Sequence, residues 1–233
     1  MKNFTIIIPI YNESESIFKL IEEINIEFKR FKPELIIVND GSTDNFLKNK
    51  NRIKYKKFKI INHKKNFGKC KAMYSGVKNA KNRYICIIDG DGQNPPHEAK
   101  KLMKFWNNLN LNEKSFGLVC GNRINRQDTV LKKISSRIAN KVRRFILKDE
   151  CNDTACALKV FSKNDYIKLE YFVNMHRFLP ALFKMHSGVI FNVPVLDRKR
   201  TRGVSKYSFN NRFWVGILDL IRVWLMIFKR RKV

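Results

Sequence analysis

Short apolar runs alternate along the first 90 residues with segments whose apolar positions recur every three or four residues. The apolar runs are rich in Ile and Val, and each is followed by Pro, Asn or Asp. Such runs predict strands that are buried on both faces of a sheet. Pro9 is expected to end the first strand, because proline cannot donate to a sheet ladder. The predicted strands are Phe4–Ile8, Leu35–Val38, Phe58–Ile61 and Tyr84–Ile88.

Two segments between these runs have helical spacing. Ile17, Leu20, Ile21, Ile24 and Phe28 form one apolar helix face, and a second stripe follows the third strand. The alternation of strands and helices predicts an α/β fold with a mostly parallel sheet covered on both faces. In such sheets ligands bind at the carboxyl edge of the strands. We therefore expect the loops at residues 9–13, 40–44, 66–69 and 89–93 to converge there.

The predicted strand Tyr84–Ile88 leads directly into Asp89 and Asp91, two carboxylates separated by one glycine, with Gln93 close behind. Carboxylate and amide oxygens suit Mg²⁺ or Mn²⁺, and these ions commonly share their coordination shell with substrate phosphates. A plain turn is the alternative, because Asp and Gly are frequent turn formers. The carboxylates that follow other strands, such as Asp40, favour the metal site.

The chain is strongly basic, with a formal net charge of +28 over 233 residues. This length predicts one domain with a substantial core. The charge predicts an acidic partner, which could be nucleic acid, anionic lipid or a phosphorylated substrate, although solvated lysines account for part of the excess. The sequence has no G-x-G-x-x-G after its first strand and no G-x-x-x-x-G-K-[ST], which argues against a dinucleotide fold and a P-loop NTPase.

The cysteines and histidines point to a reducing compartment and away from zinc. Five Cys is an odd number without metal-site spacing, and Cys86 and Cys120 lie in apolar runs typical of reduced core thiols. The four His residues are scattered, so no zinc site is expected. The apolar run Ile6–Ile10 is too short for a signal peptide and contains Pro9. These features together predict a cytoplasmic location.

Several ordered motifs carry a resemblance to a known family. Residues 8–13, 38–44, 66–68 and 89–96, read as I-P-I-Y-N-E, V-N-D-G-S-T-D, N-x-G and D-G-D-G-Q-x-P-P, resemble family 2 glycosyltransferases of the GT-A fold. Gly121-Asn122-Arg123, His176–Leu182 and R-x-x-G-x-S-K-Y from Arg200 are similar to the branch that makes dolichyl- or polyprenyl-phosphate sugars. The resemblance covers about residues 4–210. It implies a GT-A domain over residues 1–210 and leaves residues 211–233 as a C-terminal apolar helix.

The resemblance implies roles for the residues of these motifs. It implies Mg²⁺ or Mn²⁺ on the donor diphosphate, held by Asp89, Asp91 and Gln93. It implies catalytic roles for Asp89, Asp91, Arg123, Arg200 and Lys206. The nucleotide sugar is expected to contact Pro9, Tyr11, Asn12, Glu13, Asp40, Asn66, Lys69, Asp89, Gly90 and Asp91. The acceptor phosphate is expected to contact Arg123, Arg137, Arg200, Ser205 and Lys206, with His176 as a further candidate.

The chemistry of such a transfer separates two acceptor classes. A lipid phosphate has a second pKa of about 6 and is largely dianionic at neutral pH, so it needs cations to position it and no general base. A hydroxyl acceptor needs a carboxylate base, for which Asp153 is the candidate. The chain also departs from the family pattern, since Ala155 and Ala157 replace common glycines and Asn39 replaces an acidic residue common before Asp40.

Two basic, apolar segments lie in the second half. Residues 213–228 are strongly apolar, but Asp219 and Arg222 interrupt them, and 16 residues fall short of the roughly 20 needed to span a bilayer. With the basic end at residues 229–232 they predict a helix lying in the membrane surface, and a helix docked on the protein's own core is the alternative. Residues 132–148 predict either an amphipathic helix over the acceptor site or a packed helix with a charged outer face.

We therefore expect a metal-dependent, inverting transferase at the cytoplasmic face of the membrane. It would move a sugar from a UDP- or GDP-sugar to a polyprenyl phosphate for cell-envelope glycan or lipid modification, alone or with a membrane protein partner. One alternative is a family 2 enzyme acting on a hydroxyl of a surface glycan or lipid. The others are an inactive scaffold, suggested by Ala155 and Ala157, and a nucleic-acid-binding protein. No nucleic-acid motif is present, so nucleic acid is not an expected partner.

Overall fold

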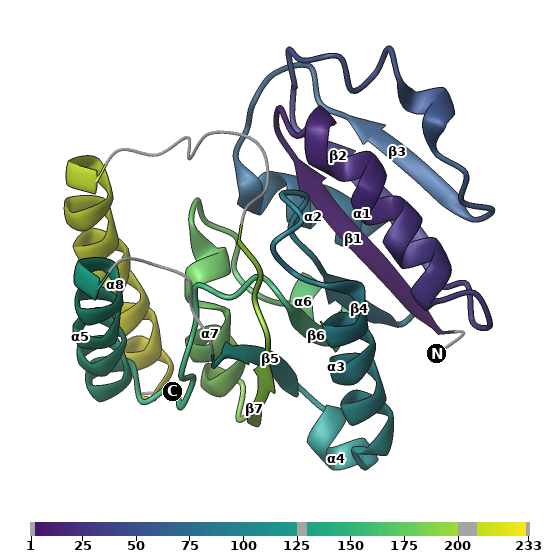
Figure 1. The fold of residues 1–233 in the computed structure, drawn as a ribbon. Helices are drawn as coiled ribbons and strands as arrows, with labels where there is room; N and C mark the ends of the chain where they lie inside the picture. Colours follow the sequence, from purple (N-terminus) through teal and green to yellow (C-terminus); the bar gives the residue numbers. More distant parts are fainter. Residues whose placement is uncertain (1–2, 125–129, 200–208, 232–233) are drawn as a thin grey trace.

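The computed structural model describes residues 3–124, 130–199 and 209–231 of the chain (Figure 1). Within them, one seven-stranded sheet forms the centre of the fold, in the order β3-β2-β1-β4-β6-β5-β7. Strand β6 runs antiparallel to both β4 and β5, and the other neighbours pair in parallel. The predicted α/β fold with a mostly parallel sheet is therefore confirmed. The strands are β1 Phe4–Ile10, β2 Glu34–Asn39, β3 Phe58–Asn62, β4 Tyr84–Ile87, β5 Leu118–Arg123, β6 Lys159–Ser162 and β7 Ile190–Val195.

Helices cover both faces of the sheet because the apolar runs point side chains to both sides (Figure 1). In β1, Ile6 and Ile8 pack with α1 (Ser14–Glu27) and α3 (Pro96–Asn108). Ile7 points to the other face, into a core shared by the remaining central helices. Those helices are α2 Lys69–Asn79, α6 Lys163–Ile167 and α7 Leu179–Met185, and short helices lie at η1 Lys50–Arg52, α4 Leu111–Lys114 and η2 Met175–Arg177.

Pro9 does not end the first strand, and that prediction is wrong. It lies inside β1, opposite Val38 of β2. On the other side of β1, the ladder with β4 stops at the pair Ile7 and Ile87, where the Ile88 amide donates to the Ile7 carbonyl at 3.1 Å. The missing N–H of Pro9 falls beyond that ladder, so it removes no hydrogen bond.

The predicted convergence of loops at the carboxyl edge is confirmed for the loops after β1, β2 and β4. The Asn12 amide donates to the Ser42 hydroxyl at 2.9 Å, and the Asn12 side-chain oxygen accepts from the Thr43 amide at 2.7 Å. The Ser16 hydroxyl in the first turn of α1 donates to the Gly90 carbonyl at 2.9 Å. These hydrogen bonds connect the loop after β1 and the start of α1 to the loops after β2 and β4.

Two long helices, α5 (Val130–Leu147) and α8 (Phe209–Arg231), lie side by side on one flank of the molecule (Figure 1). Helix α8 begins at Phe209, earlier than expected, because the polar residues 210–212 carry no apolar signal. Its Val223 is fully buried, and Asp219 accepts a hydrogen bond from Asn174 at 3.1 Å. The inner face of α8 is thus docked on the core. Among the described residues, no helix is long and apolar enough to cross a membrane.

Candidate active site

The carboxylate of Asp40, at the end of β2, organises the loop that follows β3. One oxygen accepts hydrogen bonds from the His63 ring at 2.7 Å and the Phe67 amide at 3.1 Å. The other oxygen accepts from the Gly68 amide at 2.7 Å, and the residue is only 3% exposed. A buried carboxylate with these partners holds the loop in place. Its predicted contact with the nucleotide stays a prediction.

The predicted metal ligands lie just after β4. Lys69, the first residue of α2, places its ammonium 2.5 Å from an oxygen of Asp89, and both side chains are about a quarter exposed, at 26% and 29%. The carboxylate of Asp91 accepts a hydrogen bond from the Gln93 amide at 3.0 Å. A Cβ atom at Gly90 would lie 2.5 Å from the Ile10 side chain, so the residue between the two carboxylates has to be small.

These residues fit a metal ion that is bound together with a diphosphate. Among the described residues, no group of three or more His, Cys, Asp or Glu side chains is placed to hold a metal by itself. Asp89 and Asp91 offer hard carboxylate oxygens, and Gln93 adds an amide oxygen. Mg²⁺ is typically held by one or two carboxylates, with substrate phosphates and water completing the shell. The donor set matches that pattern better than a closed protein site.

The other predicted donor residues sit along the same edge. The Glu13 carboxylate accepts from the Ser16 hydroxyl at 3.1 Å, and Ser16 in turn contacts the Gly90 carbonyl. The Asn66 side chain accepts from the Gly68 amide at 3.0 Å, next to Lys69. Three strand-end loops therefore bring these predicted residues together: Pro9, Tyr11, Asn12 and Glu13 from β1 and its loop, Asp40 from β2, and Asp89, Gly90 and Asp91 from β4.

Arg123, at the end of β5, is bound by two carboxylates. Its Nε and Nη2 donate to the two oxygens of Asp153 at 2.7 and 3.1 Å, and its Nη1 lies 3.5 Å from Asp197. Burial lowers the pKa of Arg123, but the ion pairs with Asp153 and Asp197 outweigh it and raise that pKa above its ordinary value. The guanidinium is therefore permanently charged. Both oxygens of Asp153 accept from it, which is a poor arrangement for a general base.

His176 contacts Cys70, a residue that the sequence analysis did not single out. The Cys70 sulfur lies 2.9 Å from the His176 Nδ1 and accepts from the His176 amide at 3.3 Å. Cys70 follows Lys69 in the first turn of α2, so His176 packs against the start of the helix that also carries the partner of Asp89. Burial raises the pKa of Cys70, which keeps it a thiol. The two residues are 106 positions apart, and no local pattern signals their contact.

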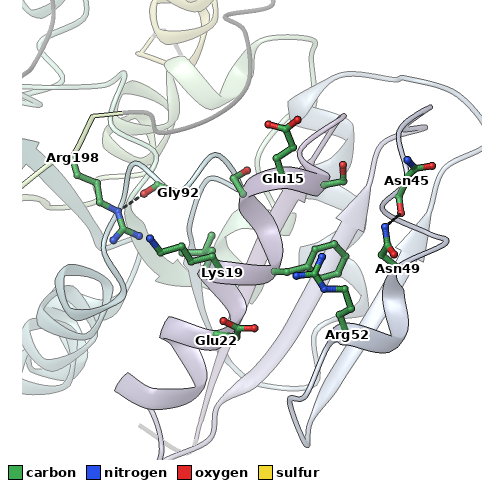
Figure 2. A pocket seen from close by; sticks show the side chains of 12 residues that line it. Glu15, Lys19, Glu22, Asn45, Asn49, Arg52, Gly92 and Arg198 are labelled. Atoms are coloured by element: carbon green, nitrogen blue, oxygen red, sulfur yellow. Dashed lines mark hydrogen bonds between the residues drawn. The ribbon is translucent and has the colours of Figure 1, made fainter.

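Asp197 and Arg198, just beyond β7, are further site residues that no motif identified. The Asn94 side chain donates to Asp197 at 3.3 Å. Arg198 donates from Nε to the Gly92 carbonyl at 2.5 Å, as Figure 2 shows. The only signal in the sequence is their position directly before the Arg200 motif. Arg200, Ser205 and Lys206 lie outside the described residues, as does the side chain of Arg137, so their roles stay predictions.

A groove of about 820 Å³ runs along the outer side of α1 and ends at Gly92 and Arg198 (Figure 2). It is lined by residues of both charges, including Lys19, Glu22 and Arg52. Neither Asp89 nor Asp91 lines it. The groove therefore lies beside the predicted donor site and not in it.

The fold and this edge are those of a glycosyltransferase of the GT-A type. The chain belongs to glycosyl transferase family 2, whose family model matches residues 5–169. The family prediction and the prediction of a glycosyltransferase are both confirmed.

Named relatives and solved structures agree with this placement. A dodecaprenyl-phosphate galacturonate synthase of Rhizobium johnstonii is 33% identical over 98% of this chain and 68% of its own length. An undecaprenyl-phosphate 4-deoxy-4-formamido-L-arabinose transferase of Pectobacterium carotovorum is 28% identical over 90% of this chain. The chain spans 64% of that relative's length.

The structural comparison supports the fold alone. A crystal structure of glucosyl-3-phosphoglycerate synthase from Mycobacterium tuberculosis, in complex with Mn²⁺, UDP and glucosyl-3-phosphoglycerate, matches with a TM-score of 0.70. The match has 14% identity and covers 97% of this chain and 79% of that one. A second structure of the same enzyme, with Mg²⁺ and UDP, matches with a TM-score of 0.68. The predicted GT-A fold is thereby confirmed.

Proposed function

We propose that this protein transfers one sugar from a nucleotide sugar to a polyprenyl phosphate, with Mg²⁺ or Mn²⁺ and with inversion at the anomeric carbon. The observation that carries the proposal is the pair Asp89 and Asp91 at the end of β4, beside Lys69 and on the edge where the donor motifs meet. The product, a polyprenyl-phosphate sugar, would serve cell-envelope glycan or lipid modification. The names of the two relatives support a polyprenyl-phosphate sugar as the product.

The donor side follows from the chemistry of the leaving group. A divalent ion, when bound, stabilises the charge that develops on the departing nucleoside diphosphate. Asp89, Asp91 and Gln93 would hold it. The Lys69 ammonium lies 2.5 Å from an oxygen of Asp89, so it offsets the negative charge of that carboxylate. From this position it would contact a donor phosphate. The identity of the sugar and the choice between UDP and GDP are left to the donor panel below.

The acceptor side favours a phosphate over a hydroxyl. The carboxylate named as the base for a hydroxyl acceptor, Asp153, is 4% exposed and binds Arg123 through both oxygens. A phosphate dianion attacks without such a base and needs cations to orient it. Arg123, Arg200 and Lys206 would supply them, with His176 on the donor side of the same region. The relatives' names, with dodecaprenyl and undecaprenyl phosphate, support the lipid phosphate.

The outer face of α5 and α8 suits the cytoplasmic surface of a membrane. On α8 the face opposite the buried Val223 carries exposed apolar side chains, and α5 adds Phe145, which is 84% exposed. Basic residues such as Lys141 and Lys229 flank this face. An apolar helix face with flanking cations binds anionic lipid surfaces. A membrane protein covering the same face is the alternative. The exposed apolar residues are Ile138, Val142, Phe145 and Ile146 on α5 and Val215, Leu218, Ile221, Trp224, Leu225 and Phe228 on α8.

A transfer assay tests the proposal. The purified chain would be mixed with Mn²⁺ or Mg²⁺, a short polyprenyl phosphate and a panel of labelled UDP- and GDP-sugars, and label reaching the organic phase would be counted. We expect metal-dependent transfer from one donor. Release of free sugar without lipid labelling would contradict the proposed acceptor, and silence with every donor from a folded protein would support the inactive scaffold.

A further inference from the structure

The turn that carries the metal-binding residues is held from outside by Arg198. Arg198 donates from its side-chain Nε to the Gly92 carbonyl at 2.5 Å and from its main-chain amide to the Gln93 carbonyl at 3.1 Å. Figure 2 shows the side chain reaching the turn from the chain beyond β7. Gly92 has a φ of +75°, in the left-handed region. Both carbonyls of this left-handed turn thus accept from one residue.

The rest of the guanidinium binds α1. Its Nη1 and Nη2 donate to the two oxygens of Glu23 at 3.2 and 2.5 Å. A bidentate Arg–carboxylate pair fixes direction as well as distance. Both side chains are partly exposed, at 38% and 25%, so the pair adds little to folding stability. Its consequence is geometric, because it ties the turn to a helix packed against the sheet.

The residues around Arg198 strengthen this attachment. The Leu196 amide donates to the buried Glu98 carboxylate at 3.1 Å, and Asp197 accepts from Asn94 at 3.3 Å while also lying near Arg123. The segment 196–198 is therefore bonded along residues 92–98, the turn and the start of α3. This segment leads directly into residue 200, where the predicted acceptor motif begins.

We infer that Arg198 is a positioning residue of this transferase, which sets the orientation of Asp91 and Gln93 by holding the Gly92 and Gln93 carbonyls against α1. The inference rests on the proposed function of the turn as the metal and diphosphate site. Arg198 also lies two positions before Arg200, the first residue of the predicted acceptor motif.

Arg198→Lys tests the inference, because lysine keeps the charge but cannot bond Gly92 and Glu23 together. Binding of Mn²⁺ would be measured by electron paramagnetic resonance in the presence of UDP and, separately, of GDP, and transfer would be measured against Mn²⁺ concentration. Loss of a group that orients metal ligands typically weakens metal affinity about 10- to 100-fold. We expect a weakening in this range for Arg198→Lys, a smaller one for Glu23→Gln, and recovery of transfer at high Mn²⁺.

Arg52→Ala is the matched control, since Arg52 lines the same groove and lies 4.6 Å over the Phe18 ring without reaching the turn. It should bind Mn²⁺ like the original protein. Unchanged Mn²⁺ affinity in Arg198→Lys would overturn the inference while leaving the proposed function intact. Absence of Mn²⁺ binding in the unmodified protein, with UDP and also with GDP, would overturn both the inference and the proposed function. A fall in melting temperature that accounts for the whole loss of binding would also overturn the positioning role.

Discussion

The two halves of the chain build their parts of the site in different ways. In residues 3–108, the predicted functional residues lie at or beyond the carboxyl ends of parallel strands or open a helix, as Asp40 follows β2 and Asp89 follows β4. From residue 118 on, side chains from separate segments meet through ion pairs, as Arg123 meets Asp153 and Asp197. The proposed donor side is therefore placed mainly by sheet topology, and the proposed acceptor side is placed mainly by charge pairing.

This difference predicts different consequences of substitution. On the donor side, changing a side chain removes a ligand from a scaffold that stays in place. On the proposed acceptor side, changing one member of an ion pair leaves the other member partly buried without its counter-charge. The groups that this second side chain binds are then expected to move. The predictions below test this contrast.

Asp91→Asn is expected to give the largest effect. Removing one charged oxygen ligand from a two-carboxylate metal site should lower transfer by about 10³-fold, because the leaving diphosphate loses its stabilising ion. The fold should be unaffected, since asparagine keeps a side-chain oxygen that can accept from the Gln93 amide. Initial rates at saturating Mn²⁺ measure the effect, with Glu22→Gln as the control carboxylate. A rate within threefold of the original would contradict the metal role.

Arg123→Leu should destabilise the fold, in contrast to Asp91→Asn. Side-chain exposures of 14% for Arg123 and 5% for Asp153 mean that the substitution leaves a carboxylate buried without its bidentate partner. Breaking such a pair costs about 3 kcal/mol of unfolding free energy. The double variant with Asp153→Leu should recover more than half of the loss, as measured by urea denaturation. An unfolding free energy of Arg123→Leu equal to that of the original protein would show that the Arg123–Asp153 pair does not stabilise this half of the chain.

Phe145→Asp should weaken binding to anionic vesicles about tenfold, because it replaces an apolar contact with a charge on the proposed membrane face. Vesicle sedimentation measures the effect. Ile26→Asp is the matched control, since Ile26 is 75% exposed on α1. An equal loss in both variants would mean that α5 and α8 form no specific membrane face.

Cys70→Ala should have the smallest effect, about threefold on transfer, because a thiol is a weak hydrogen-bond donor. Burial raises the pKa of Cys70, so the thiol stays protonated at neutral pH. Its sulfur lies 2.9 Å from His176 Nδ1, and we expect the thiol to donate to that nitrogen. This places the ring proton on Nε2. Above the raised pKa of Cys70 the thiolate would accept instead, and the proton should move to Nδ1. Nitrogen chemical shifts of His176 across the pH range measure the tautomer. The same His176 tautomer in Cys70→Ala and in the original protein would show that Cys70 does not set the protonation of the His176 ring.

The sequence pattern was sufficient for the parts that depend on neighbours along the chain. Apolar runs located β1 to β4, and the carboxylates after β4 marked the turn that is predicted to bind the metal. The prediction for Pro9 was wrong because a strand accommodates proline only where no ladder hydrogen bond is needed. That position depends on where the β1–β4 ladder ends, which the sequence of one strand does not show. The antiparallel β6 was not predicted for the same reason.

Contacts between distant segments carried no local signal. Arg198 and Glu23 are 175 positions apart, and Arg123 and Asp153 are 30 apart. The sequence offered many arginines in the second half and no means to tell which of them were paired. For α8, the pattern gave two alternatives, and the structure combines a docked inner face with an exposed apolar outer face.

The most direct test of the central claim compares two acceptors that differ only in the phosphate. Polyprenyl phosphate and the free polyprenol of the same chain length would be offered to the purified protein with Mn²⁺ and the preferred donor. The account predicts transfer to the phosphate alone, because Asp153 is bound to Arg123 and no base is needed for a dianion. Equal or faster labelling of the alcohol would contradict it.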